Sequence, residues 1–587
     1  MAIQLSDIEQ RSQYGEFLTT VSKWIGFPAA APAGLRGDFH PATPAQVAQL
    51  ERQGCVSSDW GRIHFCSNSD LANFWRSRFE GRCYFEAHPS DGASRSLTVE
   101  NCRVRDSVIL SGCRIQDVSQ IHATIIFKET EILHGGALGG IDHHSFGLDR
   151  EIAFAPGGGR RSLPVFADAS IAELAAMARL APEDPLLAQY RDFVAKLVRN
   201  MRCTLTFIGS GGMLRNFGTI TRSYLGRAVK VEGAPLVSEC ILLSSARRPT
   251  QLLVPGPLTR AVAQEGCEFS NGGRADNVFL AEGSHVRDHA SATSSIIASN
   301  TGVGGGELRH SFLGPLTGFS HQALCIATFW PGGRGNVSYG ANVGSNHSGR
   351  AADQEHFAGE GVFYGLGCDI KFPFNTMDAP YTIFATGVVC QPQKFDFPFS
   401  LVNIPEHSGP AVPRGLNEAF PGWQVRNNLY GLLRNQEKFQ TRNSAEREVV
   451  ETRVFRKEFR AGAERALAAL RGAAKQDAAG VLPSGERWFT EDQVPGLGKN
   501  YVREPQVRAG ILHYEFLLRL IAYFELAGSG KAAQGLDVVK DVVKTLEENR
   551  RKDFDRGRRV IPDYEEIHGT IAQDSLIQAW KERLEGD

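Results

Sequence analysis

Side chains that can do chemistry are concentrated between residues 310 and 378 of this 587-residue chain. Histidines, carboxylates, an asparagine and basic side chains all occur in this short interval, and a hydrophobic core needs none of them. They are His310, His321, Asn346, His347, Arg350, Asp353, Glu355, His356, Glu360 and Lys371, with Trp330 among them. We therefore expect the functional site in this part of the chain.

His347 is the best candidate for a general base. An unperturbed imidazole titrates near neutral pH, so its neutral form can take a proton from a hydroxyl or an amine. The neighbouring Asn346 can stabilise an oxyanion, and His321 is a further catalytic candidate. Arg350 and Lys371 suit a phosphate or carboxylate group. The predicted substrate-binding set is Arg350, Lys371, Glu360, His310 and Trp330.

A metal site is an alternative use of the same histidines. Catalytic zinc takes three protein ligands, often all histidine, and His310, His321 and His347 are the candidates. His285 with His289, or His143 with His144, are further possibilities. No spacing among them compels a metal.

Each of these residues also has a purely structural interpretation. His310 and His321 can occupy turns, and Asn346 can take a left-handed backbone conformation. Arg350, Asp353 and Glu355 can form a solvated ion cluster. Trp330 begins a Trp-Pro-Gly-Gly segment that is typical of a protruding turn, although its ring can also line a pocket wall.

Charge and composition narrow the class of protein. The net charge of −1 argues against a dedicated nucleic-acid binder, and no apolar run is long enough to span a membrane. The first 13 residues lack the apolar core of a signal peptide. The 11 cysteines form no Cys-x-x-Cys pair, so we expect buried, reduced thiols in a cytoplasmic protein.

Glycine is in excess, and the hydrophobic spacing indicates why. The chain has 62 glycines, or about 10.6% against an average near 7%. From residue 97 an apolar residue tends to recur every six positions, a period that fits a parallel β-helix with tight turns between flat faces. Those turns favour glycine. The positions are Leu97, Arg103, Ile109, Ile115, Ile121, Phe127 and Leu133, of which Arg103 alone is not apolar.

The changes of pattern divide the chain into five predicted segments. Residues 1–90 form an N-terminal α/β cap, 91–135 the first coils of a β-helix, and 136–202 a helical insertion. Residues 203–405 form the main β-helix and 406–587 a helical domain rich in Ala, Glu, Arg and Leu. Within these segments we expect helices at 7–26, 44–53, 171–180, 186–200, 444–475, 504–526, 538–549 and 572–584.

Several motifs follow one another over roughly residues 43–443. They are Thr43–Cys55, Asp59–Ile63, Tyr339–Arg350, Gly359–Pro373, Ala379–Gly387, Phe397–Val402, Pro421–Trp423 and Leu433–Asn435. Together they resemble a bacterial family of long left-handed β-helix proteins of unknown function. The resemblance implies a mainly β fold, a left-handed parallel β-helix of the hexapeptide-repeat transferase type, and a homotrimer. It implies no particular reaction.

Three functions remain open on this fold. The first is acyl transfer from an acyl-CoA-like donor to a hydroxyl or amine of a sugar or other small molecule, in a groove between subunits. His347 would be the base. The second is a metal-dependent lyase or hydrolase similar to the γ-class carbonic anhydrases. The third is a non-enzymatic scaffold. A nucleotide-sugar ligand is a weaker possibility, because the N-terminal residues show no nucleotidyl-transfer loop.

Overall fold

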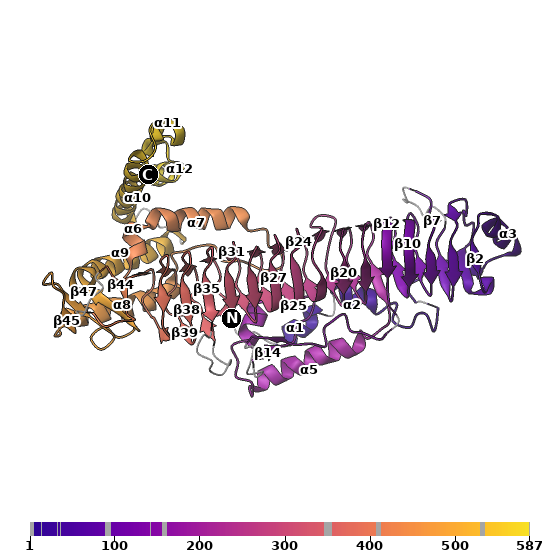
Figure 1. Cartoon of the computed structure of the whole chain (residues 1–587), viewed down its shortest axis with the longest axis horizontal. Coiled ribbons are helices and arrows are strands. Elements are labelled where there is room, and N and C mark those ends of the chain that lie inside the picture. The colour runs from indigo at the N-terminus through magenta and orange to yellow at the C-terminus, as the bar shows by residue number, and fades with distance from the viewer. Residues whose placement is uncertain are drawn as a thin grey trace.

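The chain folds into an elongated parallel β-solenoid of about 19 turns, with helices at its C-terminal end (Figure 1). The computed structural model describes residues 5–12, 15–31, 33–35, 37–87, 95–140, 142–154, 161–345, 355–406, 412–528 and 535–585. The mainly β class and the parallel solenoid that the sequence predicts are confirmed.

Three parallel stacks of short strands form the three faces of the solenoid. The first face contains β4 (Phe74–Trp75), β7 (Thr98–Glu100), β10 (Arg114–His122), β12 (Glu131–Leu138), β16 (Met213–Arg215), β19 (Lys230–Glu232), β22 (Gln251–Leu253), β24 (Glu268–Ser270), β26 (His285–Arg287), β28 (Gly302–Gly304), β31 (Gly318–Ser320), β34 (Asn336–Val337), β37 (Phe363–Tyr364), β40 (Ile383–Phe384) and β43 (Leu401–Asn403).

The second face continues from the first around a corner, and the long strands β10 and β12 bend from one to the other. Its other strands are β2 (Val56–Ser57), β5 (Arg78–Glu80), β8 (Arg103–Arg105), β17 (Thr219–Thr221), β20 (Leu236–Ser238), β23 (Leu258–Ala263), β25 (Arg274–Leu280), β27 (Ser291–Ile297), β29 (Glu307–Arg309), β32 (Leu324–Ile326), β35 (Asn342–Ser345), β38 (Asp369–Lys371) and β41 (Val389–Cys390).

The third face completes each turn and shares β23, β25 and β27 with the second. Its other strands are β3 (Ile63–Cys66), β6 (Cys83–Phe85), β9 (Val108–Ile109), β11 (Thr124–Ile126), β15 (Thr206–Ile208), β18 (Tyr224–Leu225), β21 (Ile241–Leu242), β30 (Phe312–Leu313), β33 (Thr328–Trp330), β36 (His356–Phe357), β39 (Phe374–Asn375) and β42 (Gln393–Lys394). The strand β1 (Phe39–Pro41) pairs with β3 in the antiparallel sense.

Most regular turns of the solenoid are 17 residues long, one short of three sixes. Ile115 pairs with Ile132, and Val286 with Val303. Ile115 and Ile121 of the six-residue series are therefore buried in the core. Because a turn is one residue shorter than 18, the series falls one position too late at Phe127 and Leu133, which are only half-buried. Their predecessors Ile126 and Ile132 are fully buried instead, and Arg103 is exposed.

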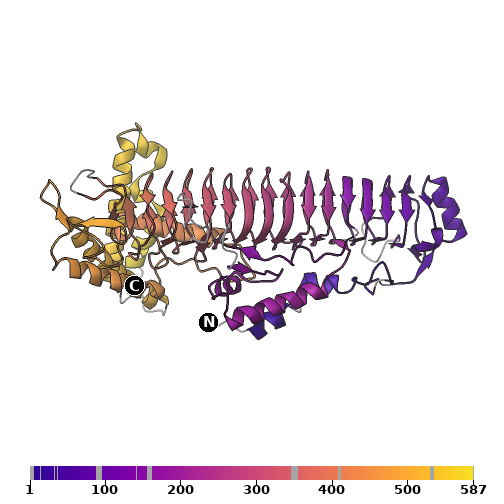
Figure 2. The ribbon, with the colours of Figure 1, turned by 60° about the horizontal axis from the view of Figure 1, so that its bottom comes forward.

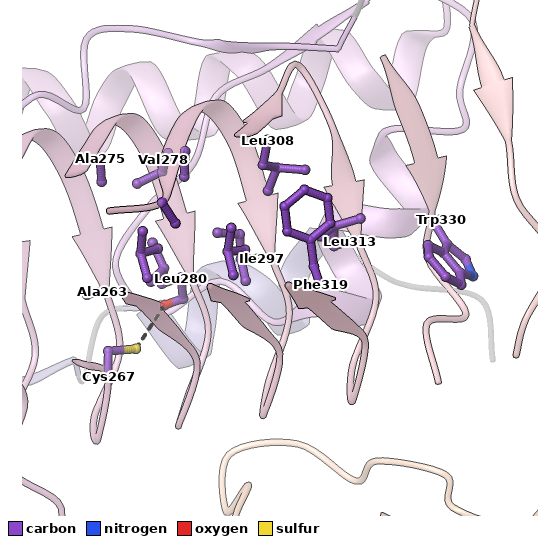
Figure 3. Close-up of a cluster of buried hydrophobic side chains, with 14 of the residues drawn as sticks. Ala263, Cys267, Ala275, Val278, Leu280, Ile297, Leu308, Leu313, Phe319 and Trp330 are labelled. Carbon is purple, nitrogen blue, oxygen red and sulfur yellow. Dashed lines mark hydrogen bonds between the residues drawn. The ribbon is translucent and has the colours of Figure 1, made fainter. Parts of the chain in front are cut away.

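Each turn is stabilised because its inward side chains stack on those of the next turn. Figure 3 shows such a stack, in which Leu280, Ile297 and Leu313 follow one another along the solenoid. All 11 cysteines are buried, nine of them in this core, and burial raises the pKa of Cys267 to about 12. The predicted burial of the cysteines is therefore confirmed.

The corners between faces carry the left-handed residues that tight turns need. Glycine occupies some of them, such as Gly233 and Gly305. Asn271, His310 and His321 occupy others, because short polar side chains tolerate positive φ better than most. The corners thus account for part of the glycine excess only. Other glycines lie on the faces, where a Cβ would collide with the neighbouring turn.

The insertion and the first two helices cover the third face. They are α1 (Leu5–Ser12), α2 (Glu16–Val21), α4 (Ile171–Met177), α5 (Pro185–Asn200) and the hairpin β13 (Ile152–Ala153) with β14 (Ser162–Leu163). Phe17, Phe146 and Tyr190 pack there with outward residues of the face such as Phe279 and Phe312. The single helix expected at 7–26 is thus two short ones, and they lie beside α5 (Figure 2).

Helices close both ends of the solenoid. At the N-terminal end the predicted helix is α3 (Pro44–Arg52), with the expected Thr43 cap, and its Leu50 joins the core. At the other end lie α6 (Trp423–Asn427), α8 (Arg460–Ala473) and α9 (Glu504–Gly528), with β44 (Asn417–Phe420), β45 (Gly480–Val481), β46 (Arg487–Phe489) and β47 (Asn500–Arg503). Beyond them α10 (Leu536–Arg558), α11 (Tyr564–His568) and α12 (Ser575–Glu585) project from the rod (Figure 1).

The prediction of a helix at 444–475 is wrong for the first half of that segment. Residues 444–456 run as an extended strap over the solenoid and the insertion, and the helix begins only at residue 460. Arg447 pairs with Glu265 at 2.7 Å and with Asp168 at 2.9 Å, while the Glu448 carboxylate accepts a hydrogen bond from the backbone N–H of Ile171. These tertiary contacts outweigh the intrinsic helix propensity of the segment.

A helix that the sequence patterns did not predict lies along the first face. This helix, α7 (Leu429–Arg442), runs over the strands between α6 and the middle of the solenoid (Figure 1). Its Leu429, Leu432, Leu433 and Phe439 are buried. Among the described helices none is long and apolar enough to cross a lipid bilayer.

Candidate functional site

A groove of about 610 Å³ lies between α7 and the outward surface of the first face. Its volume falls in the range of small-molecule sites. Six consecutive strands, β26, β28, β31, β34, β37 and β40, supply the floor, and one stripe of α7 supplies the wall. The wall residues are Asn428, Gly431, Leu432, Asn435, Lys438, Phe439 and Arg442, which recur every three or four positions along the helix.

Basic side chains gather at the C-terminal end of α7. Lys438 and Arg442 line the groove opposite Arg287 of β26. Partial burial lowers the pKa of Lys438, and the charges of Arg442 and Arg434 lower it further. Arg287 lies near Asp288, but within the described part of the chain no carboxylate forms an ion pair with Lys438 or Arg442. The local field therefore favours an anionic ligand.

The floor at this end is shaped by glycine. Gly302 and Gly304 stand at the outward positions of β28, next to His285 and Arg287 of β26. The imidazole of His285 occupies the space that a Cβ on residue 302 would need. Burial lowers the pKa of His285, and Arg287 lowers it further, so the imidazole is neutral near pH 7. A neutral imidazole in this position can exchange a hydrogen bond with a bound group.

An ion network supports the groove from below. Arg334 lines the groove and donates from Nε to Glu360 Oε1 at 2.8 Å. Arg456 and the hydroxyl of Tyr381 donate to the same oxygen, each at 2.8 Å. Burial alone would raise the pKa of Glu360, but Arg334 and Arg456 outweigh it and the net direction is downward. The network holds the strap, through Arg456, against the turns that form the floor.

The predicted site residues do not meet in one place. His347, Asn346 and Arg350, with Asp353, lie outside the described residues. His321 is exposed at the corner between the first and second faces. His310 occupies the corner between the second and third faces, where its Nδ1 lies 2.9 Å from the carbonyl oxygen of Ala153.

The remaining candidates lie in still other surroundings. Trp330 is 0% exposed and lies in the core (Figure 3), and its ring packs against that of Tyr364. Lys371 is half-buried on the second face. Glu360 belongs to the ion network, and Glu355 pairs with Arg161 of the insertion. His356 is fully buried, its Nε2 lies 2.8 Å from the Tyr364 hydroxyl, and burial lowers its pKa to about 3.

The candidate metal ligands are likewise dispersed. His310 and His321 lie at different corners, and His285 points over the first face while His289 sits at the next corner. His143 is exposed, whereas His144 is buried. Over the described ranges no three side chains of histidine, cysteine, aspartate or glutamate are grouped as a metal would require.

Sequence reasoning missed the groove itself. The floor comes from residues 285–383 and the wall from residues 424–442, so no local motif joins them. One signal was present in the chain: the basic residues Arg434, Lys438 and Arg442 recur every four residues. Like charges at this spacing cost a helix stability, so such a row favours a role in binding anions.

Comparison with other proteins gives a family but no activity. The profile of a family described as "Domain of unknown function (DUF4954)" matches residues 39–350, which is more than half of the chain. An uncharacterized protein of Treponema pallidum (strain Nichols) is 31% identical over 140 residues. That stretch is 24% of this chain and 18% of the Treponema protein. The match to the family includes the groove floor from His285 to Asn336, but not α7.

Proposed function

We propose, from the premise that the chain belongs to the DUF4954 family, that it is a transferase whose phosphate-bearing donor binds in the groove beneath α7. The observation that carries the proposal is the cationic end of the groove, where Lys438 and Arg442 face a glycine-lined floor without an acidic partner among the described residues. Acyl-CoA is our first choice of donor, and a sugar or small-molecule hydroxyl or amine our choice of acceptor.

The finer architecture that we propose is a left-handed β-helix of the hexapeptide-repeat type, assembled as a homotrimer. Three flat faces and turns of about three times six residues support the type. In this chain α7 lies along the first face, and α1, α2, α4 and α5 lie along the third. That arrangement leaves the second face for a neighbouring copy.

In the proposed reaction a histidine removes the proton from the acceptor hydroxyl or amine. The acceptor then attacks the thioester carbonyl, the carbon–sulfur bond breaks, and the imidazolium returns the proton to the thiolate that leaves. We keep His347 as the proposed base. The proposal rests on its Gly-Ser-Asn-His setting in the sequence.

His285 is the second histidine to test. It is the described histidine that lines the groove, but it lies at the cationic end, where we expect the phosphates of the donor. We therefore assign it to donor binding. Once turnover is measurable, His347→Ala is expected to lower kcat, whereas His285→Ala is expected to raise KM for the donor and leave kcat nearly unchanged.

A ligand panel tests the proposal. Thermal unfolding of the full chain would be followed with coenzyme A, acetyl-CoA, a UDP-sugar and inorganic phosphate. A rise in Tm with the coenzyme A compounds supports acyl transfer. A rise with the UDP-sugar alone moves the proposal to nucleotide-sugar chemistry. No rise with any of them contradicts it and favours the scaffold, and stoichiometric zinc or iron by elemental analysis would favour the metal-dependent alternative.

A further inference from the structure

The lining of the groove beneath α7 changes character from one end to the other. We infer that it takes an elongated anionic amphiphile, with phosphates at the C-terminal end of α7 and an apolar acyl chain at the N-terminal end. This inference rests on the proposed function and deepens it, because it names the class of donor and its direction in the groove.

Hydrogen bonds at both ends of the helical segment fix the direction in which α7 runs along the solenoid. Near its C-terminal end, Asn300 Nδ2 donates to Asn443 Oδ1 at 3.0 Å, and Ser444 Oγ donates to Asn300 Oδ1 at 2.7 Å. At the other end, Gln424 of α6 donates to the carbonyl oxygen of Tyr381. The helix therefore runs antiparallel to the advance of the solenoid.

The cationic end lies over β26 and β28. Arg287, Lys438 and Arg442 line it, together with His285 and Asn300. These side chains offer hydrogen-bond donors to phosphate oxygens, and the C-terminal position of Lys438 and Arg442 on α7 is favoured by the helix dipole. The other basic side chain of the lining, Arg334, is paired with Glu360, and β37 and β40 contribute the uncharged Phe363 and Ile383.

The middle of the groove is polar, and the charge of Arg334, which lines it there, is paired with Glu360. Ser320 of β31 and Asn336 of β34 form its floor, and Asn435 of α7 faces them. The Asn336 side chain donates from Nδ2 to the Ser338 hydroxyl at 2.8 Å, which holds the amide in place. Amides and hydroxyls in this position suit a linker that itself carries amide groups.

At the far end, apolar side chains line the groove beside the hydrogen-bonded amides of Gln424 and Asn428. Phe363 of β37 pairs in register with Ile383 of β40, and both line the groove with Leu432 of α7. Phe363 is 39% exposed, although an aromatic ring gains stability by burial. A bound acyl chain would remove this surface from water.

The length of the groove agrees with such a ligand. Five spacings of about 4.8 Å separate β26 from β40, which gives about 24 Å. The 14 residues of α7 extend about 21 Å at 1.5 Å per residue. An extended phosphopantetheine thioester fills a groove of these proportions, whereas a nucleotide-sugar has no apolar group for the Phe363 end.

Affinities for a chain-length series test the inference. Calorimetry on the full chain would compare coenzyme A, butyryl-CoA and octanoyl-CoA. We expect octanoyl-CoA to bind about tenfold more tightly than coenzyme A, the gain from burying two or three methylene groups. Phe363→Ala should reduce that ratio to below about threefold and leave the Kd of coenzyme A unchanged. Met213→Ala is the control, because Met213 is 38% exposed on β16 of the same face, outside the groove.

Equal affinity across the series, or a chain-length gain that Phe363→Ala and Met213→Ala alter alike, overturns the proposed direction and class of ligand while the donor site stands. No binding of any coenzyme A compound overturns the proposed function as well.

Discussion

The imidazole of His285 lies against the backbone of Gly302 in the next turn, in the space where any other residue would place its Cβ. This contact sets the floor of the groove at its cationic end. Gly302→Ala should displace His285 toward α7 and weaken binding of coenzyme A on the order of tenfold, which calorimetry measures directly.

Gly304→Ala is the matched control for that substitution. It lies in the same strand, also faces outward, and its added Cβ would meet no atom closer than 3.8 Å, an ordinary van der Waals distance. Neither glycine has a left-handed backbone. Equal effects of the two substitutions would show that the position of His285 does not matter for binding.

The second prediction concerns the positive charge at the C-terminal end of α7. Lys438→Gln and Arg442→Gln should each weaken coenzyme A binding several-fold and reduce its dependence on salt concentration, because each removes one charge that faces the phosphates. Lys544→Gln on α10 removes the same charge from an exposed position outside the groove and should change neither quantity. A comparable loss of coenzyme A affinity with Lys544→Gln would show that the effect comes from the net charge of the protein and not from the groove.

We predict that Glu360 stabilises the folded protein and does not bind the ligand. Glu360→Gln leaves Arg334 and Arg456 buried without their partner, which costs about 3–5 kcal/mol in typical buried pairs. Glu458→Gln removes an exposed carboxylate 3.6 Å from the same Arg456 and should cost less than about 1 kcal/mol. Urea unfolding measures both. Full stability in Glu360→Gln, with lost ligand binding, would restore Glu360 as a binding residue.

Acid should destabilise the solenoid through His356. Burial lowers its pKa in the folded protein to about 3, against about 6.5 when unfolded. The unfolded chain therefore binds the proton more readily, so this contribution to stability is complete above about pH 6.5 and is lost as the pH falls toward 3. His356→Gln should show a smaller drop in urea midpoint between pH 7.5 and 5 than the wild type.

The exposed His143 provides the control for that pH dependence. His143→Gln should keep the wild-type loss of midpoint. If His356→Gln loses stability with acid as steeply as the wild type does, the buried imidazole is not a source of the acid sensitivity.

The spacing of apolar residues was sufficient to predict a parallel β-solenoid, because inward positions such as Ile115 and Ile121 follow from the geometry of stacked turns. It could not place Phe127 or Leu133, since a single missing residue in each turn moves the register. The strap at 444–456 was misassigned because Arg447 and Glu448 gain more from distant partners than from a helix.

The candidate site was harder to predict for a physical reason. Its histidines were chosen by their closeness in sequence, yet His310 and His321 face different corners of one rod. Neighbouring floor strands of the groove lie 16–27 residues apart in the chain, and the helix that forms its wall follows all of them. Only packing decides which face α7 covers, and no local pattern records that choice.

Hydrogen exchange with and without coenzyme A is the most direct test of a donor site beneath α7. We expect the ligand to slow amide exchange in α7 and in the floor strands from β26 to β40, and we expect Lys438→Gln with Arg442→Gln to abolish the protection at the same ligand concentration. Protection confined to the N-terminal turns of the solenoid or to α10–α12, or none at saturating coenzyme A, would contradict a donor site beneath α7.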